Sequence, residues 1–267
     1  MSGSGRRSDA SVQARRETIL DRVLSTGRAE IRELADQFEV SVMTMHRDLD
    51  ALVADGLVAK QRGWAEAPPA VLVQTSARFR LRTGQDMKRA LADAAARHLT
   101  DAGTVLLDDS TSCLGLIDGL GGTRPVTVVT NYLRAARDAG ARPGVRVHLL
   151  PGEYRPDLDA VFGLGTVDGF RSWRADVAAF SVPAVTGGQM FHPLPDSLAL
   201  KEAMTGAAAR RVLLIDHTKF GHTAAHVFAP LTESDVVIVD DATPAAEIRA
   251  LRGFTRHVEV VPVPRPG

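Results

Sequence analysis

The stretch VSVMTMHRDLDALVADGLV, residues 40–58, decides the fold of the N-terminal part of the chain. Ser41 is a favourable N-cap, because a serine oxygen accepts a hydrogen bond from the free N–H groups of a first helical turn. The predicted helix runs to about Asp55, and Gly56 occupies the position where helices commonly end. Upstream, two apolar stripes at helical spacing predict two shorter helices. The first stripe is Ile19, Leu20, Val23 and Leu24, and the second is Ile31, Leu34, Ala35 and Phe38. Only residues 39–41 separate the last two helices, and so short a turn indicates a helix-turn-helix.

The helix that Ser41 begins has two unlike faces. The side that must pack on the other helices carries Val42, Met45, Leu49, Leu52 and Val53. The opposite side carries Met43, Thr44, Arg47 and Asp50, with His46 at its flank. Recognition helices place their N-terminal residues against base edges, and arginine pairs bidentately with guanine. We therefore predict DNA contacts from Ser41, Met43, Thr44, His46 and Arg47; a solvated Arg47, or its ion pair with Asp50, is the alternative interpretation.

The residues that follow this helix predict a two-stranded wing. Lys60 and Arg62 come after an apolar pair, and Gly63 marks a turn. The two cations are expected to touch backbone phosphates, which position a protein on DNA without reading sequence. The alternative is an exposed edge strand blunted by charge. Because Pro68-Pro69 favours extended chain, we predict a disordered arm at 1–10, a winged helix-turn-helix at 11–66, a linker at 67–77 and an effector-sensing α/β domain at 78–267.

Length and composition bound the class of protein. A chain of 267 residues, 45% hydrophobic and 24% charged, suits two soluble globular domains. No apolar run approaches the roughly 20 residues that span a bilayer, and the N-terminus lacks the apolar core of a secretory signal. The single cysteine, Cys113, excludes an intrachain disulfide and a cysteine-based zinc cluster. These features predict a cytoplasmic protein with no membrane contact.

The charge balance restricts how this chain can bind nucleic acid. The formal net charge is zero, which argues against nonspecific coating of DNA, because such binding is driven by charge. Residues 1–63 themselves hold ten basic and ten acidic residues. Affinity for DNA must therefore come from the placement of individual arginines and lysines.

From Gly84 onward, predicted helices alternate with short apolar strands. The helices fall near 87–103, 114–120, 132–139, 198–209 and 245–252. The strands fall at 104–108, 126–130, 145–150, 178–182, 212–216, 226–231 and 236–240. Strands rich in valine and leucine between helices predict a largely parallel sheet with helices on both faces. Open sheets of this kind bind ligands outside the carboxyl ends of their strands.

Polar residues cluster where these strands end. The loop DDSTS at 108–112 precedes a helix, whose N-terminus favours an anion such as phosphate, although plain N-capping is the alternative. Lys219, one of only four lysines, and Arg155 also follow strands and suit a ligand anion, with ordinary surface charge as the alternative. One or two of the aspartates at strand ends, Asp108, Asp176, Asp216 and Asp240, are expected to accept hydrogen bonds from ligand hydroxyls. The predicted ligand-binding residues are Asp108, Ser110, Thr111, Ser112, Thr130, Asn131, Gly152, Arg155, Asp216 and Lys219.

Several other site types lack their sequence patterns. His192, His217, His222 and His226 do not follow a metal-binding spacing such as His-Glu-x-x-His. No serine stands in a nucleophile-elbow motif, and Gly121-Gly122 and Gly187-Gly188 are turn signals without a dinucleotide fingerprint. We therefore predict no catalytic residue, no metal and no cofactor.

Taken together, these motifs resemble the DeoR family of bacterial transcription regulators over nearly the whole chain. The helix with His46-Arg47 before Asp48-Leu49 is similar to that family's signature helix, which usually has two adjacent arginines. The C-terminal part is similar to the family's sensor domain, itself like ribose-5-phosphate isomerase. The residues that match in order are Asp108 with Thr111-Ser112, Thr130-Asn131, Gly152, Asp176 with Phe180, Lys201 with Met204, and Asp216 with Lys219-Phe220-Gly221. The family's Asp-x-Gly-Thr-Thr has Ser110 in place of glycine, and its Gly-Gly is Pro151-Gly152.

The resemblance implies a repressor of carbohydrate-metabolism genes that binds a pseudo-palindromic operator as a homodimer or homotetramer. A phosphorylated sugar would modulate that binding, its phosphate held by residues 110–112 with Lys219 as counter-charge and its hydroxyls by Asn131 and Asp108. The main alternative is a sugar-phosphate isomerase or hydrolase with an appended DNA-binding module, for which Asp108 or Glu153 would be the base. A sensor that has lost its ligand and represses constitutively is a further alternative.

Overall fold

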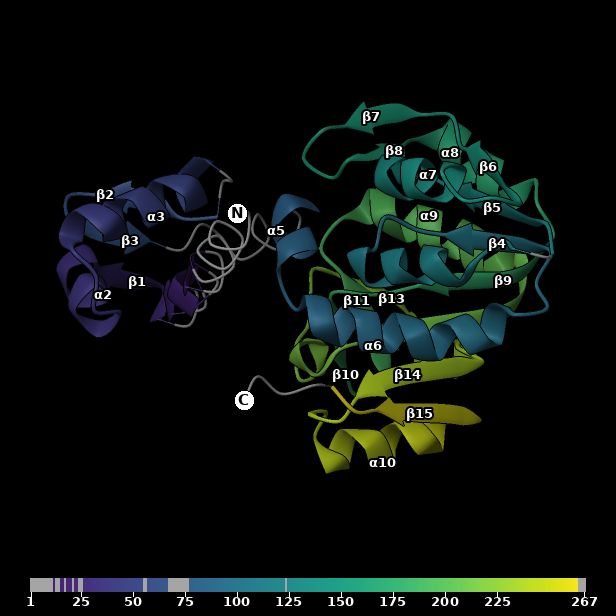
Figure 1. The fold of residues 1–267 in the computed structure, drawn as a ribbon. Helices are drawn as coiled ribbons and strands as arrows, with labels where there is room; N and C mark the ends of the chain where they lie inside the picture. Colours follow the sequence, from purple (N-terminus) through teal and green to yellow (C-terminus); the bar gives the residue numbers. More distant parts are fainter. Residues whose placement is uncertain are drawn as a thin grey trace. The chain divides into compact units, whose positions relative to one another are not determined.

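The computed structural model describes residues 12, 15–16, 18–20, 22–23, 26–54, 57–66, 77–122 and 124–263. The chain forms two compact units, Met1–Thr83 and Gly84–Gly267 (Figure 1). The predicted arm at 1–10, the predicted helix stop Gly56 and residues 67–76 of the predicted linker lie outside the described residues. The last residue assigned to that linker, Ala77, begins helix α5 (Ala77–Arg82).

The N-terminal unit combines helices with a small antiparallel sheet. Residues 18–20 and 22–23 are helical, and α2 (Ile31–Gln37) and α3 (Val42–Ala54) follow. The three-stranded sheet has the order β1-β3-β2, with β1 at Arg28–Glu30, β2 at Ala59–Gln61 and β3 at Trp64–Glu66. The β2–β3 turn places Arg62 and Gly63 at φ values of 44° and 88°, a region that glycine adopts readily. The predicted winged helix-turn-helix is confirmed.

Helix α3 packs through its middle. Met45, Leu49 and Leu52 are buried in one cluster with side chains of the preceding helices. Two residues predicted on the same face do not pack: Val42 is 43% exposed and Val53 is 39% exposed. They stand near the two ends of a 13-residue helix, whereas α2 has only 7 residues. At 1.5 Å of rise per residue, α2 is about 9 Å shorter than α3, so α2 does not cover the two ends of α3.

The C-terminal unit is built on a seven-stranded parallel sheet with the order β15-β14-β12-β9-β4-β5-β6. Its strands are β4 (Thr104–Leu107), β5 (Val126–Thr130), β6 (Val145–Leu149), β9 (Ala175–Phe180), β12 (Ala208–Ile215), β14 (Val236–Asp240) and β15 (His257–Val261). The chain starts at β4, runs outward to β6 and returns at β9 on the other side of β4. This reversal is a topological switch point, where open α/β sheets bind ligands outside the strands' carboxyl ends.

Both faces of the parallel sheet are covered. Successive strand residues point to opposite faces, and Val105, Leu106 and Leu107 of β4 are each at most 1% exposed. The α-helices are α6 (Gln85–Ala96), α7 (Leu133–Gly140), α8 (Leu164–Arg171), α9 (Pro195–Gly206) and α10 (Ala245–Phe254). In Figure 1, α6 lies in front of the sheet and contacts β12, β14 and β15, while α9 contacts β9 and β12. The predicted parallel sheet with helices on both faces is confirmed.

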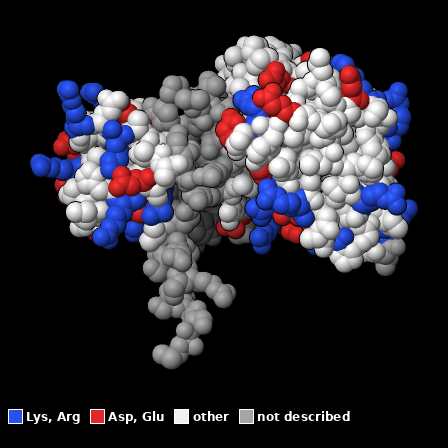
Figure 2. Space-filling view, turned by 90° about the horizontal axis from the view of Figure 1, so that it is seen from above, with Lys and Arg blue, Asp and Glu red and all other residues white. Residues whose placement is uncertain are grey.

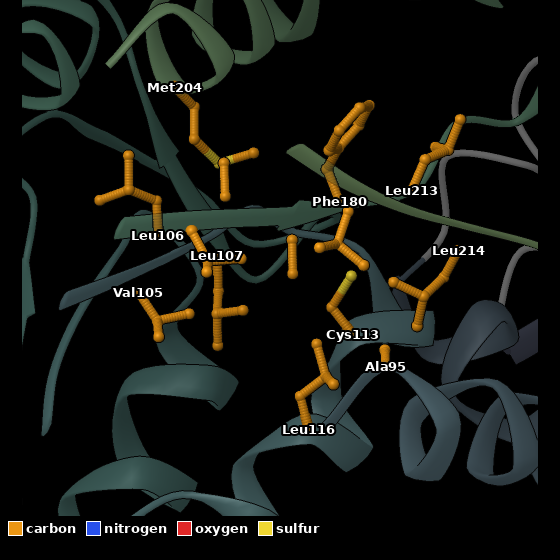
Figure 3. Close-up of a cluster of buried hydrophobic side chains, with 14 of the residues drawn as sticks. Ala95, Val105, Leu106, Leu107, Cys113, Leu116, Phe180, Met204, Leu213 and Leu214 are labelled. Carbon is orange, nitrogen blue, oxygen red and sulfur yellow. The ribbon is translucent and has the colours of Figure 1, made fainter. Parts of the chain in front are cut away.

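The main core gathers hydrophobic side chains from the central strands and from the elements that cover them (Figure 3). The labelled side chains are Ala95, Val105, Leu106, Leu107, Cys113, Leu116, Phe180, Met204, Leu213 and Leu214. Leu116 and Cys113 belong to a 3-10 helix, η2 (Thr111–Gly119), which occupies the segment predicted as a helix at 114–120. A Cβ at Gly115 would stand 2.8 Å from the Ala92 Cβ, so glycine permits η2 to pack closely on α6.

Two small antiparallel sheets accompany the parallel sheet. A hairpin joins β7 (Glu153–Arg155) to β8 (Ala160–Phe162), and a second sheet has the order β10-β11-β13, with β10 at Ala184–Thr186, β11 at Gln189–His192 and β13 at His226–Pro230. The strand predicted at 226–231 therefore lies outside the parallel sheet. Its first residues, His226 and Val227, are exposed, whereas central parallel strands are buried on both faces. Short 3-10 helices stand at Arg97–Leu99 (η1), His217–Lys219 (η3) and Leu231–Glu233 (η4). Among the described residues, no helix is long and apolar enough to cross a bilayer.

Candidate functional site

The exposed face of α3 presents the residues predicted to contact DNA. The Ser41 Oγ accepts a hydrogen bond of 3.1 Å from the Thr44 N–H and lies 2.9 Å from the Thr44 Oγ1. Ser41 therefore caps α3 and orients the hydroxyl of Thr44. Met43 is 65% exposed, Arg47 is also exposed, and His46 is half-buried at the flank. Lys and Arg side chains project from this unit in the space-filling view (Figure 2).

The opposite side of α3 carries a buried carboxylate. Asp48 is 2% exposed, and its two oxygens accept hydrogen bonds of 2.8 Å from the Nε atoms of Arg15 and Arg16. Both arginine side chains remain partly exposed. These ion pairs join the helical N-terminal segment to α3.

One predicted phosphate contact in the wing has a partner within the protein. The Lys60 Nζ donates to the Asp50 Oδ1 at 2.5 Å, and this hydrogen bond lowers the pKa of Asp50. Arg62 is exposed at the turn, and the Arg28 guanidinium of β1 lies 4.7 Å from the centre of the ring of Trp64, which follows that turn. Lys60 therefore tethers the wing to the exposed side of α3. In this conformation Asp50 pairs with Lys60 and not with Arg47, the pair considered above.

In the C-terminal unit, a buried ion pair lies at the switch point. Asp108 follows β4, Ser181 follows the adjacent β9, and Lys201 comes from α9. The Lys201 Nζ donates to the Asp108 Oδ2 and, at 2.8 Å, to the Ser181 carbonyl oxygen. The side chains of Lys201 and Asp108 are 2% and 5% exposed. Two charges have thus been removed from water at the place where a doubly wound sheet binds ligands.

The loop that begins at Asp108 folds back on this carboxylate. Ser110 donates to the Asp108 Oδ1 through its backbone N–H and to the Oδ2 through its hydroxyl, both at 2.9 Å. Burial raises the pKa of Asp108, whereas the charge of Lys201 opposes that rise. Residues 108–112 are all buried. The Ser110 N–H, predicted to face a phosphate, is therefore engaged by Asp108.

The end of β5 supplies a buried amide next to this loop. Thr130 and Asn131 are 0% and 1% exposed. The Asn131 Nδ2 donates to the Val161 carbonyl oxygen at 3.1 Å, and the Asn131 Oδ1 has no hydrogen-bond partner. A buried acceptor without a donor is costly, so this oxygen is suited to a ligand hydroxyl.

Gly152 and Arg155, which follow β6, have structural partners. A Cβ at Gly152 would lie 2.3 Å from the Thr166 Oγ1 and 2.5 Å from the Phe162 carbonyl oxygen, so close packing requires glycine there. The Arg155 guanidinium lies 3.6 Å from carboxylate oxygens of both Asp157 and Asp196. It also stands 5.6 Å from the centre of the Phe162 ring. In this conformation Arg155 holds the β7–β8 hairpin rather than offering an unpaired cation.

The end of β12 places Lys219 nearer to solvent. The Asp216 Oδ1 accepts a 3.0 Å hydrogen bond from the Thr218 N–H, and the Lys219 Nζ lies 3.9 Å from the Asp216 Oδ2. The Lys219 side chain is 31% exposed. At the end of β14, Asp240 caps the next turn and lies 2.9 Å from the His217 Nδ1. Asp216 and Lys219 therefore stand at the same carboxyl edge as Asp108.

The fourth aspartate considered as a ligand acceptor lies at the other edge. Asp176 is at the amino end of β9, where its Oδ2 accepts hydrogen bonds of 2.8 and 2.9 Å from the N–H groups of Gly103 and Thr104. It therefore fixes the start of β4. The strand was predicted to begin at residue 178, which placed Asp176 in a loop.

Family models match both units. One described as a DeoR-like helix-turn-helix domain matches residues 15–69, and one described as a DeoR C terminal sensor domain matches residues 83–241. The chain belongs to the DeoR family. It is a DNA-binding transcription regulator of that family, and the predicted resemblance is confirmed.

Relatives of this DeoR-family chain align over nearly their whole length. An uncharacterized HTH-type transcriptional regulator of Escherichia coli K12, YgbI, is 30% identical over 89% of this chain and 93% of its own. The glycerol-3-phosphate regulon repressor of the same strain is 25% identical over 92% of this chain and 98% of its own. Among solved structures, ribose 5-phosphate isomerase A of Methanocaldococcus jannaschii superposes with a TM-score of 0.36 and 13% identity, over 52% of this chain and 55% of its own.

The resemblance matched Lys201 to the family, but its ion pair with Asp108 was not predicted. A signal for Lys201 was present in α9, where Ser197 and Met204, four residues before and three after it, are both buried. Spacing of this kind puts a lysine on the packed face of a helix. A charged residue on such a face is rare unless it is paired.

Proposed function

We propose that this DeoR-family regulator is a repressor of carbohydrate-metabolism genes whose affinity for its operator depends on a phosphorylated sugar bound at the carboxyl edge of the parallel sheet. The observation that carries the proposal is the buried Lys201–Asp108 pair at the switch point between β4 and β9. Burying two charges costs free energy that a hydrophobic pair would not cost. Its position beside a ligand-binding edge gives it a role in binding rather than in stability.

The groups around the pair suit a polyhydroxylated anion. Asp108 and the orphan Asn131 Oδ1 would accept hydrogen bonds from sugar hydroxyls. The half-exposed ammonium of Lys219, 3.9 Å from its nearest carboxylate oxygen, would meet the phosphate together with the hydroxyls of Thr111 and Ser112. One relative is named a glycerol-3-phosphate regulon repressor, and glycerol 3-phosphate is a phosphorylated polyol, which supports this ligand class.

The DNA half of the proposal rests on the exposed end of α3. Met43, Thr44 and Arg47 would face base edges, with Met43 offering apolar contact to a thymine methyl group. Lys60 and Arg62 would meet phosphates. A dimer or tetramer would place two such helices on a pseudo-palindromic operator, and light scattering of the purified protein tests that stoichiometry.

Arg47→Ala tests the recognition helix. Because Arg47 is exposed, the unfolding midpoint should hardly change, while discrimination between operator and random DNA should fall by about 1–3 kcal/mol. Competition binding with both DNAs measures this, with exposed Arg32→Ala on α2 as the matched control. Unchanged discrimination would remove Arg47 from the base-reading face.

A thermal-shift screen with phosphorylated sugars tests the sensor. A ligand at 100 times its dissociation constant adds about 2.7 kcal/mol to stability, and the same compound should release the operator. Lys219→Ala should lose both responses and still bind DNA. Arg174→Ala, which alters a cation just before β9 at the opposite edge, should keep them. A full response in Lys219→Ala would exclude that residue from the site.

Assay of isomerase activity addresses the alternative of an enzyme. A general base would also have a raised pKa, as Asp108 has. Lys201 and Ser110, however, already donate three hydrogen bonds to this carboxylate, which leaves room for one further donor such as a sugar hydroxyl. Glu153, the other base considered, is exposed on β7. The purified protein is expected to bind a phosphorylated sugar without converting it, and turnover of ribose 5-phosphate would favour the enzyme.

A further inference from the structure

The C-terminal unit carries a second cluster of ligating side chains, away from the carboxyl edge. His98 lies in η1, and His257 and Glu259 lie two residues apart on β15, so they share one face of that strand. The His98 Nε2 is 3.3 Å from the Glu259 Oε2. One nitrogen or oxygen of each residue lies within 4.8 Å of the corresponding atom of the other two.

Two imidazoles and one carboxylate form a common ligand set for a first-row transition metal. Zn²⁺ binds histidine nitrogen and carboxylate oxygen at about 2.0–2.2 Å, so ligand atoms of a tetrahedral site stand about 3.3–3.6 Å apart. The His98–Glu259 separation already meets that value. His257 is exposed, and its ring lies 5.3 Å from that of His98, so a rotation of the His257 side chain would bring its nitrogen into the set.

We propose that His98, His257 and Glu259 bind a divalent transition-metal ion, with Zn²⁺ as the best match, and that the ion clips the edge strand β15 to the end of α6. Three protein ligands leave one coordination position for water or another ligand. Sequence spacing gave no sign of such a site, because His98 and Glu259 are 161 residues apart.

The surrounding charges decide which class of ion fits. The Arg97 guanidinium donates to the Glu259 Oε1, and Arg97 and Glu259 line an open groove of about 430 Å³ together with Asp86, Asp93 and Arg89. Mg²⁺ and Ca²⁺ depend on the negative charge of carboxylates, but the arginines in this groove offset the negative charge of its carboxylates. Zn²⁺ gains much of its affinity from imidazole nitrogen and suits the cluster better.

The protonation state of His98 agrees with a role as ligand. Burial, followed by the charges of His257, Arg210 and Arg97, lowers the pKa of His98. A lower pKa favours the neutral ring, which keeps the lone pair that a metal requires. The geometry of the three side chains, and not this shift, is what identifies the site.

Titration of the full-length protein, freed of any polyhistidine tag, with Zn²⁺ against a chromophoric chelator tests the site. We expect a single ion per chain and a rise in the unfolding temperature of the C-terminal unit. Loss of a residue that only hydrogen-bonds to a metal ligand weakens metal binding by about 10- to 100-fold. Loss of a ligand itself, in His98→Ala or His257→Ala, should therefore weaken Zn²⁺ binding at least about tenfold. Co²⁺ should give visible absorption bands that His257→Ala removes.

His222→Ala provides the control, because it removes an exposed histidine outside the cluster and should leave the affinity unchanged. Exposed His257 can be replaced with little risk to folding, so the test does not depend on His98→Ala being stable. Absence of Zn²⁺ binding by the wild-type chain, or equal binding by wild type and His257→Ala, would overturn the site. Neither result bears on the phosphorylated-sugar site, which the effector screen tests separately.

Discussion

Asp48 in the helix-turn-helix and Asp108 at the sheet edge are both buried carboxylates that meet cations, but in different surroundings. Asp48 pairs with Arg15 and Arg16, whose side chains are 22% and 27% exposed and reach solvent. Asp108 pairs with Lys201, and both side chains are at most 5% exposed. The first arrangement joins two helices at modest desolvation cost. The second removes both charges from water, and a buried ion pair is often no more stabilising than a hydrophobic pair of similar size.

This difference separates a structural ion pair from a candidate binding site. Arginines at the boundary of a small domain keep part of their hydration and can satisfy a carboxylate with two forked donors. A lysine enclosed with an aspartate at a switch point has lost that hydration. The Asn131 Oδ1 near this pair accepts no hydrogen bond within the protein, so it is suited to accept one from a ligand.

The largest effect is expected for Lys201→Met. It leaves Asp108 as a buried carboxylate without its cation, a change that costs about 3–5 kcal/mol. Because Lys201 opposes the rise of the Asp108 pKa caused by burial, its loss raises that pKa further. The native state then takes up a proton more readily than the unfolded state, so the loss of stability should shrink as the pH falls. Urea unfolding across pH measures this.

The double variant Asp108→Asn/Lys201→Met sharpens the same test. Replacing both members of a buried pair is often nearly neutral, so the double variant should recover most of the stability and remain without an effector response. If Lys201→Met alone were as stable as wild type at every pH, the Lys201–Asp108 pair would be hydrated. It would then resemble the partly exposed ion pairs of Asp48, contrary to our inference.

An intermediate effect is expected for Asp48→Ala. Hydrogen bonds to charged groups contribute about 1.5–3 kcal/mol each in favourable cases, but both freed arginines can turn to solvent, so we expect a loss of about 2 kcal/mol from the N-terminal unit. Operator affinity should fall with it, because α3 loses its tie to the N-terminal segment. Trp64 fluorescence in a Trp173→Phe background follows this unit, with exposed Asp36→Ala as the control. Unchanged stability would show that the two arginine contacts are replaceable by water.

The smallest effect is expected for Lys60→Ala. Its partner Asp50 is exposed, so stability should change little. If Lys60 leaves Asp50 to meet a phosphate in the complex, the slope of log affinity against log salt should fall by about 0.9. An unchanged slope would mean that Lys60 stays on Asp50 and only holds the wing against α3.

Local patterns were sufficient for most of the fold. Ser41, the apolar repeats and the glycine at the wing turn act within a few residues, so the helix-turn-helix and the wing could be predicted. The valine-rich strands at 104–108, 126–130 and 236–240 were predicted because strands buried on both faces are apolar throughout. Strand β15 and helix α8 were not predicted, since their short, half-buried segments carry mixed polar and apolar residues.

The sequence by itself determined which residues cap, turn and fill the core, and it determined that polar groups follow the parallel strands. Tertiary structure alone decided the distant partners: that Lys201 meets Asp108, and that His98 lies beside His257 and Glu259. The physical reason is range. Capping and periodicity act over one or two turns of chain, whereas an ion pair or a ligand set depends on strand order, which brings together residues about 100 or more positions apart.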